Sequence, residues 1–273
     1  MLQGERTDTR QRSQLLPSLV TSITMLLFIL PALLAVFIQQ ASAAANVTNY
    51  AYALDIDKAM TVSTFKCLQK LGYSAVFIRA YDARGKGSFD TNAPRNVYNA
   101  YDVGLGAEVY MSPQPKSTKT GAVQCKEMLD GLKRNSVNIK TIWVQVTSPA
   151  NWGTDIKKNL AFLNDIARTA LSSGIKVGYY TNVHEWNQIT KNTKITTPNT
   201  PLWYWNTNGA GPSGETPADF KDFRPFGGFE KATVKQFGQS VSICGVLGVN
   251  RDVFDAAEKQ IFMIAKQKGT YVV

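Results

Sequence analysis

The chain has 273 residues, of which 44% are hydrophobic, and it contains no low-complexity tract. This length suits one large core, and α/β barrels of roughly 200–250 residues fold as single domains. The formal net charge of +10 favours anionic partners, such as bacterial envelope polymers or anionic lipid. Nucleic acid is not expected, because the basic residues are scattered rather than clustered. Three widely spaced cysteines are too few for a zinc site, so we expect neither a metal nor a cofactor.

The N-terminal segment has the layout of a targeting sequence. Three arginines precede an apolar run over residues 19–38, and Ala41-Ser42-Ala43 follows as an A-x-A cleavage site. We therefore interpret residues 1–43 as a signal peptide. The alternative is an uncleaved signal anchor, because the run approaches the roughly 20 residues that span a bilayer. Both interpretations place the rest of the chain outside the cytoplasm, where Asn46 of Asn46-Val47-Thr48 is a candidate glycosylation site.

From Tyr50 onward the sequence repeats a short apolar strand, a polar turn and an amphipathic helix. Eight segments have the character of strands: residues 51–56, 74–80, 106–111, 140–146, 175–181, 201–205, 233–237 and 246–250. Their near-continuous apolar runs are typical of a parallel sheet that is covered on both faces. Eight such strands predict a sheet that closes into a barrel.

Helical periodicity separates the early strands but disappears after about residue 190. One helix is predicted to begin after a Thr154 cap and to stop at Gly174. Residues 206–230 form a loop rich in Gly, Pro and Asp, and the last two strands are too close together for a helix. We therefore predict an α/β fold, an irregular TIM-like barrel of eight strands with about five helices. The alternative is an open doubly wound sheet, which no Gly-rich nucleotide loop supports.

One pair of cysteines is expected to form a disulfide in an oxidising compartment. Cys67 lies on the first predicted helix, and Cys244 lies just before the last predicted strand. These two elements are neighbours if the barrel closes. Cys67 and Cys244 are therefore the chosen disulfide candidates.

The working groups of α/β barrels lie at the carboxyl ends of the strands, and two carboxylates stand out along these strands. Asp55 emerges from the apolar first strand, whereas Asp57 is better placed to cap the following helix. Glu108 lies within the third strand, where the plain interpretation is a solvated or ion-paired side chain. On the fourth strand, alternation points Gln145 and Thr147 to the same face.

Seven segments, taken in order, carry a more specific signal. They are Asp55 with its strand and residues 72–79, 108–111, 142–144, 174–181, 201–203 and 234–237. The ordered set resembles the family 25 glycoside hydrolases, most of all their invertebrate lysozyme-like branch, over about residues 50–257. The resemblance implies a barrel with a groove that binds bacterial peptidoglycan and cuts between its two amino sugars.

The resemblance also implies which catalytic carboxylates are retained. The family uses an Asp that ends the first strand, an Asp-x-Glu on the fourth strand and an Asp on the last. Asp55 matches the first, whereas the other positions hold Gln145, Thr147 and Asn250. Glycoside cleavage needs a protonated acid and a second carboxylate, and losing a general acid alone costs about 10²–10⁴ in rate. The site thus keeps much of its hydrogen-bonding shape without most of its charge, and enzymatic activity stays an open question.

Further groove residues follow from the same resemblance. Tyr110, Tyr180 and Trp203 match aromatic positions, where ring faces pack against sugars, and each is equally compatible with an ordinary core. Gln236 matches a glutamine of the seventh strand. These four residues complete the predicted substrate-binding set with Asp55, Gln145, Thr147 and Asn250.

Two other carboxylates are considered as substitute acids beside Asp55. They are Glu108, a speculative catalytic residue, and Asp252. Glu108 is expected to point away from Tyr110, which argues against this role. The single histidine, His184, has no Ser or Cys at a suitable turn, so it is interpreted as a loop residue rather than as part of a triad.

Taken together, the sequence predicts a signal peptide or anchor at 1–43, a lysozyme-like barrel at 46–260 and a C-terminal tail at 261–273. The expected function is recognition of peptidoglycan, or a related amino-sugar polymer, in innate defence with weak or no hydrolysis. One alternative is an active muramidase that cleaves the β-1,4 bond between N-acetylmuramic acid and N-acetylglucosamine. Another is a protein-interaction module that keeps only the fold. The expected location is extracellular or endolysosomal, or a type II membrane anchorage if the leader is uncleaved.

Overall fold

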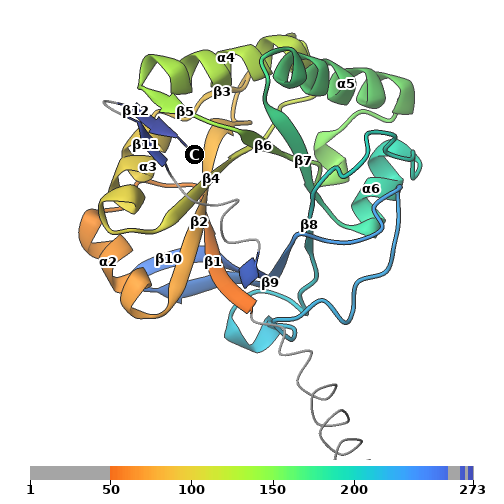
Figure 1. Cartoon of the computed structure of the whole chain (residues 1–273). Coiled ribbons are helices and arrows are strands. Elements are labelled where there is room, and N and C mark those ends of the chain that lie inside the picture. Colours follow the sequence, from red (N-terminus) through yellow and green to blue (C-terminus); the bar gives the residue numbers. More distant parts are fainter. Residues whose placement is uncertain (1–49, 258–264, 268–269, 273) are drawn as a thin grey trace, which may run out of the picture. The chain divides into compact units, whose positions relative to one another are not determined.

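The computed structural model describes residues 50–257, 265–267 and 270–272, and eight strands of this part close into a barrel (Figure 1). In order around the barrel they are β1 (Tyr50–Ile56), β2 (Tyr73–Asp82), β4 (Gly106–Met111), β6 (Thr141–Gln145), β7 (Lys176–Thr181), β8 (Leu202–Trp205), β9 (Val234–Ile243) and β10 (Val246–Asp255). Neighbouring strands are parallel except for β10, which runs antiparallel to both β9 and β1. The predicted eight-stranded barrel is confirmed.

Five α-helices of the described residues lie outside the barrel. They are α2 (Val62–Lys70), α3 (Ala93–Asp102), α4 (Gly121–Arg134), α5 (Ile156–Ser172) and α6 (Val183–Thr190). Figure 1 shows that they follow one another around the barrel from α2 to α6. Beyond α6, Phe220 and Phe223 of the long loop pack against Tyr204 of β8. The expected number of helices is confirmed, and a loop takes the place of later ones.

The beginning of α5 differs by one residue from the prediction. The side chain of Asp155, not Thr154, accepts hydrogen bonds from the backbone amides of Lys157 and Lys158. Asp155 thereby satisfies amides that have no partner inside the first helical turn. The other end agrees with the prediction, because Gly174 follows the helix with a left-handed φ of +75°.

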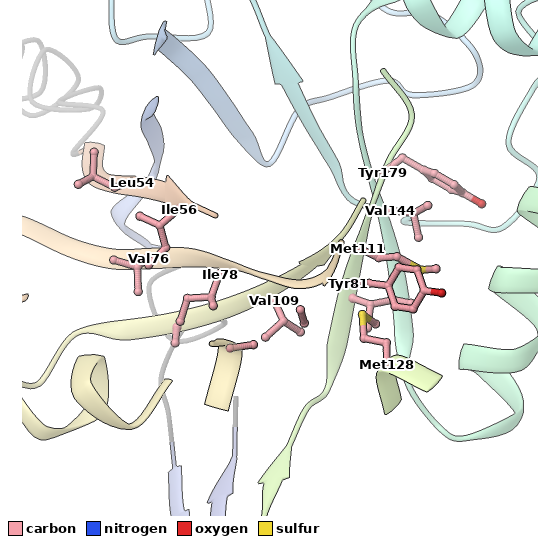
Figure 2. Close-up of a cluster of buried hydrophobic side chains, with 14 of the residues drawn as sticks. Leu54, Ile56, Val76, Ile78, Tyr81, Val109, Met111, Met128, Val144 and Tyr179 are labelled. Carbon is pink, nitrogen blue, oxygen red and sulfur yellow. The ribbon is translucent and has the colours of Figure 1, made fainter. Parts of the chain in front are cut away.

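Strand alternation divides the apolar side chains into two cores. On β1, Leu54 and Ile56 face the helices, whereas Ala53 faces the barrel interior. Figure 2 shows part of the outer core, which is mainly aliphatic but also contains nine buried aromatic residues. The interior core is small and aromatic, with Tyr180 stacked on Trp203 at 4.1 Å between ring centroids. Side chains therefore fill the barrel, and any ligand site must lie at one of its ends.

A disulfide joins the barrel's final hairpin to its first helix. Cys67 of α2 bonds to Cys244, so the structure pairs the two cysteines chosen from the sequence, and Cys125 is buried as a free thiol. Cys244 and Gly245 form the two-residue turn between β9 and β10, with φ values of +52° and +75°. Such a turn matches the twist of paired strands. The disulfide thus anchors this turn to α2.

Four short strands and two 3-10 helices complete the described residues: β3 (Ser88–Phe89), β5 (Val137–Asn138), β11 (Ala265–Gln267), β12 (Thr270–Val272), η1 (Pro149–Asn151) and η2 (Pro212–Gly214). β12 pairs with both β11 and β5. The predicted leader at 1–43 and the candidate glycosylation site at Asn46 lie outside the described residues. No helix within the described part is long and apolar enough to cross a membrane.

Candidate functional site

A polar pocket of about 240 Å³ opens at the carboxyl ends of the parallel strands. Its lining consists of Asp55, Asp57, Arg79, Tyr110, Ser112, Gln145, Tyr180, Gly248 and Asn250. The structure therefore brings together five of the predicted site residues: Asp55, Tyr110, Gln145, Tyr180 and Asn250. Four larger pockets, of about 280 to 620 Å³, lie elsewhere in the described residues, and none of these five lines any of them. The chemistry expected from the sequence belongs to the smaller pocket.

Asp55 is the carboxylate at the floor of this pocket. Its Cα lies opposite that of Asn250 on β10, and the Asn250 side-chain amide donates a hydrogen bond of 2.9 Å to Asp55 Oδ1. The other oxygen, Oδ2, is buried and has no hydrogen-bond partner within the described part of the chain. Burial raises the pKa of Asp55 to about 7; the Asn250 bond lowers it and the nearby Asp57 charge raises it further. The Asp55 carboxyl group, whose pKa is close to neutral pH, thus has one oxygen that makes no hydrogen bond within the described residues.

The two fourth-strand positions separate in the structure. Gln145 lines the pocket and accepts a 2.5 Å hydrogen bond from the Ser112 hydroxyl. Thr147 is half-buried just beyond β6 and does not belong to the lining, although its carbonyl accepts a bond from the Trp152 indole. Thr147 therefore belongs to the predicted binding set but does not line the pocket in this structure. Gln145 is the polar group that β6 presents to a ligand.

The aromatic residues lie at different depths. Tyr110 and Tyr180 line the pocket, and the Tyr180 hydroxyl donates to Gln236, which is almost completely buried. Trp203 has no exposed surface, and its indole N–H donates to Asp252 at 2.9 Å. The structure corrects the placement of Trp203 and Gln236, because both support the pocket from below and neither reaches its surface.

Glu108 also lies inside the barrel, which corrects two expectations. Residues two apart on a strand share a face, so Glu108 and Tyr110 both point inward. Glu108 is neither solvated nor ion-paired: it is 2% exposed and accepts a 3.0 Å hydrogen bond from the Trp143 indole. Burial raises its pKa to about 8, despite the opposing effect of that bond. Because Glu108 is not part of the lining, it has no access to a ligand.

Asp252 occupies a comparable position on β10. It is fully buried, and Trp203 donates to its Oδ1 while Oδ2 has no hydrogen-bond partner in the described residues. Burial raises its pKa well above the ordinary value, and the charge of Asp55 raises it further. The geometry therefore gives no support to Glu108 or Asp252 as a substitute acid at the pocket surface.

Sequence reasoning missed the charged pair at the pocket rim. Arg79, in the second half of β2, donates a 2.9 Å hydrogen bond to the carbonyl of Asp57 and forms an ion pair of 2.9 Å with Asp90. Asp57 faces Arg79 at 3.5 Å and does not cap α2, whose cap is Thr61. The signal that was available is the spacing of the two carboxylates, because Asp57 lies two residues after Asp55 and just beyond the end of β1.

One further residue is placed differently from expectation. His184 lies in the first turn of α6, not in a loop, and its ring contacts Gln188 at 2.7 Å. Within the described residues, no group of three or more His, Cys, Asp or Glu side chains has the geometry of a metal site. The pocket itself therefore offers amides, hydroxyls, aromatic rings, one guanidinium and two carboxyl groups to a ligand.

Comparisons with known proteins agree with this architecture. The family model of lysozyme-like protein 1 matches residues 46–237. Lysozyme-like protein 7 of Caenorhabditis elegans is 47% identical over 209 residues, which cover 77% of this chain and 74% of that protein. Probable GH family 25 lysozyme 2 of Dictyostelium discoideum is 33% identical over 198 residues, covering 71% and 86% respectively.

A solved structure extends the agreement in fold. The family GH25 lysozyme from Aspergillus fumigatus superposes with a TM-score of 0.57 at 17% identity, over 78% of this chain and 99% of that one. At this identity the likeness concerns the fold alone, and the closer sequence relatives carry the assignment. The chain belongs to the lysozyme-like proteins of glycoside hydrolase family 25.

Proposed function

We propose that this protein binds the glycan strand of bacterial peptidoglycan, or a related amino-sugar polymer, and hydrolyses it weakly or not at all. We place this activity outside the cytoplasm, in host defence or the handling of bacteria. Membership of a lysozyme-like family supports the substrate class. The Cys67–Cys244 disulfide supports an oxidising compartment.

The Asn250–Asp55 hydrogen bond is the observation that carries the proposal. An amide that donates to the one family carboxylate keeps Asp55 in position without adding a second charge. Gln145 and Ser112 supply further neutral polar groups in the same pocket. Sugar hydroxyl and acetamido groups bind to such neutral donors and acceptors, so the pocket suits recognition.

Weak turnover follows from what the pocket lacks. Cleavage needs an acid at the leaving oxygen and a second carboxylate facing the developing positive charge. Asp55, with a pKa of about 7, can hold a proton, but Gln145 and Asn250 cannot carry the opposing charge. Glu108 and Asp252 are buried below the surface and cannot replace them.

A slow muramidase is the second candidate, and one observation favours it. Asp57 lines the same pocket as Asp55, and its side chain is 49% exposed beside Arg79. Two carboxyl groups in unlike environments, one buried and one exposed and ion-paired, are the arrangement in which one serves as acid and the other as charged partner. Any hydrolysis would then require both Asp55 and Asp57.

The test measures binding and cleavage on the same substrate. Secreted protein is incubated with insoluble purified peptidoglycan, and both the bound fraction and the reducing ends released are determined, beside Asp55→Asn and Asp57→Asn variants. Retention on the polymer without release of reducing ends supports the recognition function. Release that disappears in both variants establishes the muramidase instead. Neither retention nor release would leave only a protein-interaction module with this fold.

A further inference from the structure

Trp205 is the aromatic residue that β8 presents at the mouth of the barrel. It follows Trp203 by two residues, so both rings lie on the inner face and Trp205 stands about 6–7 Å nearer the carboxyl end. Trp205 is half-buried and packs against the interior aromatic core. All five tryptophans of the chain fall in the described range, and the other four are at most 5% exposed. Trp205 is thus the accessible indole of this protein.

The orientation of the Trp205 ring is fixed by Glu185. The indole N–H donates 2.8 Å to Glu185 Oε2, while Glu185 Oε1 accepts a 2.7 Å bond from the backbone amide of Ser148. Glu185 is 8% exposed and lies in the first turn of α6. Glu185, which follows β7, therefore bonds both to Ser148, which follows β6, and to Trp205 at the end of β8. These two bonds hold the indole at the carboxyl ends of the three strands.

This arrangement determines what Trp205 can offer a ligand. Its only hydrogen-bond donor is already used inside the protein, so the ring surface is what remains available. The apolar C–H face of a pyranose packs on such a surface. Because the ring is held before any ligand arrives, stacking costs little side-chain entropy.

Trp205 adjoins the Asp55 pocket through its neighbours. Its Cα pairs with that of Gln236 on β9, and Gln236 accepts the hydroxyl of Tyr180, a residue of the pocket wall. The pocket volume of about 240 Å³ is smaller than the roughly 300–1,000 Å³ typical of sites that hold drug-sized ligands. A glycan chain therefore needs contact surface beyond the pocket.

We propose that Trp205 is a stacking platform for a second sugar ring, linked to the ring that the Asp55 pocket holds. The site then recognises at least two linked amino sugars, and Glu185 acts as the positioning residue of the platform. This inference rests on the proposed glycan recognition and specifies how far the binding site extends.

The experiment compares N-acetylglucosamine and its β-1,4-linked oligomers of two to four units, using the full secreted protein and isothermal titration calorimetry. We expect wild-type affinity to rise with chain length. Trp205→Leu should weaken binding of the trimer and tetramer by about 3- to 10-fold, as expected for loss of one aromatic contact, and leave the single sugar unchanged. Trp205→Phe, which keeps a ring, should retain most of the affinity. Leu171→Ala, an exposed position on α5, is the control for unrelated surface changes.

Fluorescence supplies a second readout. Iodide should quench mainly Trp205 in the free protein, and the tetramer should protect it; both effects should vanish in Trp205→Phe. Glu185→Gln can accept only one of the two N–H bonds, so its loss of tetramer affinity should be intermediate while the single sugar binds normally. If wild type neither binds an oligomer nor is retained on insoluble peptidoglycan, the proposed function itself fails; retention on peptidoglycan without oligomer binding would disprove the platform for linked N-acetylglucosamine rings. If wild type shows length-dependent binding and the folded Trp205→Leu variant binds the oligomers with the same affinity, the platform is disproved while glycan recognition stands.

Discussion

The Asn250 amide donates a 2.9 Å hydrogen bond to Asp55, across the antiparallel pairing of β10 with β1. A carboxylate at position 250 could not donate this bond, and two charges in contact would force one of them to hold a proton. Asparagine at position 250 thus holds Asp55 by a hydrogen bond, at a position where the resemblance to family 25 glycoside hydrolases predicts a second carboxylate. Gln145 on β6 is likewise an amide where the resemblance predicts an acid.

Restoring the missing carboxylates should restore hydrolysis. The combined variant Gln145→Asp, Thr147→Glu and Asn250→Asp puts carboxyl groups at the three positions where the resemblance predicts the family's acid and its charged partners. We expect release of reducing ends from peptidoglycan to rise by about 10²-fold or more over wild type, the usual contribution of a general acid.

Adding Asp55→Asn to the combined variant should abolish the gain. A properly folded combined variant with wild-type activity would mean that more than the carboxylates separates this groove from a working muramidase.

The barrel was predictable because its strands and helices have strong local patterns. Near-continuous apolar runs predicted all eight barrel strands. The helical periodicity of the sequence disappears after about residue 190, which is where α6 ends in the structure. The helix cap at Asp155 was missed by one residue because Thr154 and Asp155 are both good capping residues. A local sequence pattern therefore predicts that a helix or strand exists more securely than it predicts the residue at which the element begins.

The candidate site was predictable only in part, because depth along the barrel axis has no signature in the sequence. Trp203 and Trp205 share a strand face, and only the structure shows that the first is buried and the second partly exposed. The link from Glu185 to Trp205 joins α6 to β8, a contact that spacing does not reveal. The face of Glu108, in contrast, follows from simple alternation with Tyr110 and was assigned wrongly.

Stability should depend on pH because carboxyl groups are buried within the barrel. The folded-state pKa values of Asp55 and Glu108 are raised to about 7 and about 8, above their ordinary values of 3.8 and 4.5. A carboxyl group whose pKa is raised by folding stabilises the fold fully at pH values below its ordinary pKa. This contribution is lost as the pH rises through its folded-state pKa. We expect the unfolding free energy to fall by a few kcal/mol between pH 5 and pH 9, as measured by urea denaturation.

Glu108→Gln should flatten this dependence. Its amide oxygen can still accept the Trp143 bond, but the side chain no longer ionises. Glu230→Gln, at an exposed position, should leave the slope as in wild type. If the unfolding free energy of Glu108→Gln depends on pH as steeply as that of wild type, Glu108 is not a source of the pH dependence.

The Cys67–Cys244 disulfide should contribute strongly to stability. It links residues 177 apart in sequence and so restricts a long loop of the unfolded chain. The double variant Cys67→Ser, Cys244→Ser should lower the free energy of unfolding by about 2–5 kcal/mol. Reduction with dithiothreitol should weaken wild type by a similar amount and leave the variant unaffected; equal effects on both would assign the loss to another cause.

The contact between α4 and α5 should tolerate no side chain at Gly121. A Cβ atom there would lie 2.2 Å from the Phe162 carbonyl oxygen and 3.0 Å from Ile166 Cγ1. The helices would have to separate, because a backbone oxygen cannot turn away as a side chain does. We expect Gly121→Ala to lower the free energy of unfolding by about 1–3 kcal/mol, the usual range for overpacking. Gly153→Ala is the matched control, since its nearest neighbour would be 3.7 Å away. Equal stability of the two variants in urea denaturation would show that α4 can shift without cost, and would remove close packing as the reason for glycine at position 121.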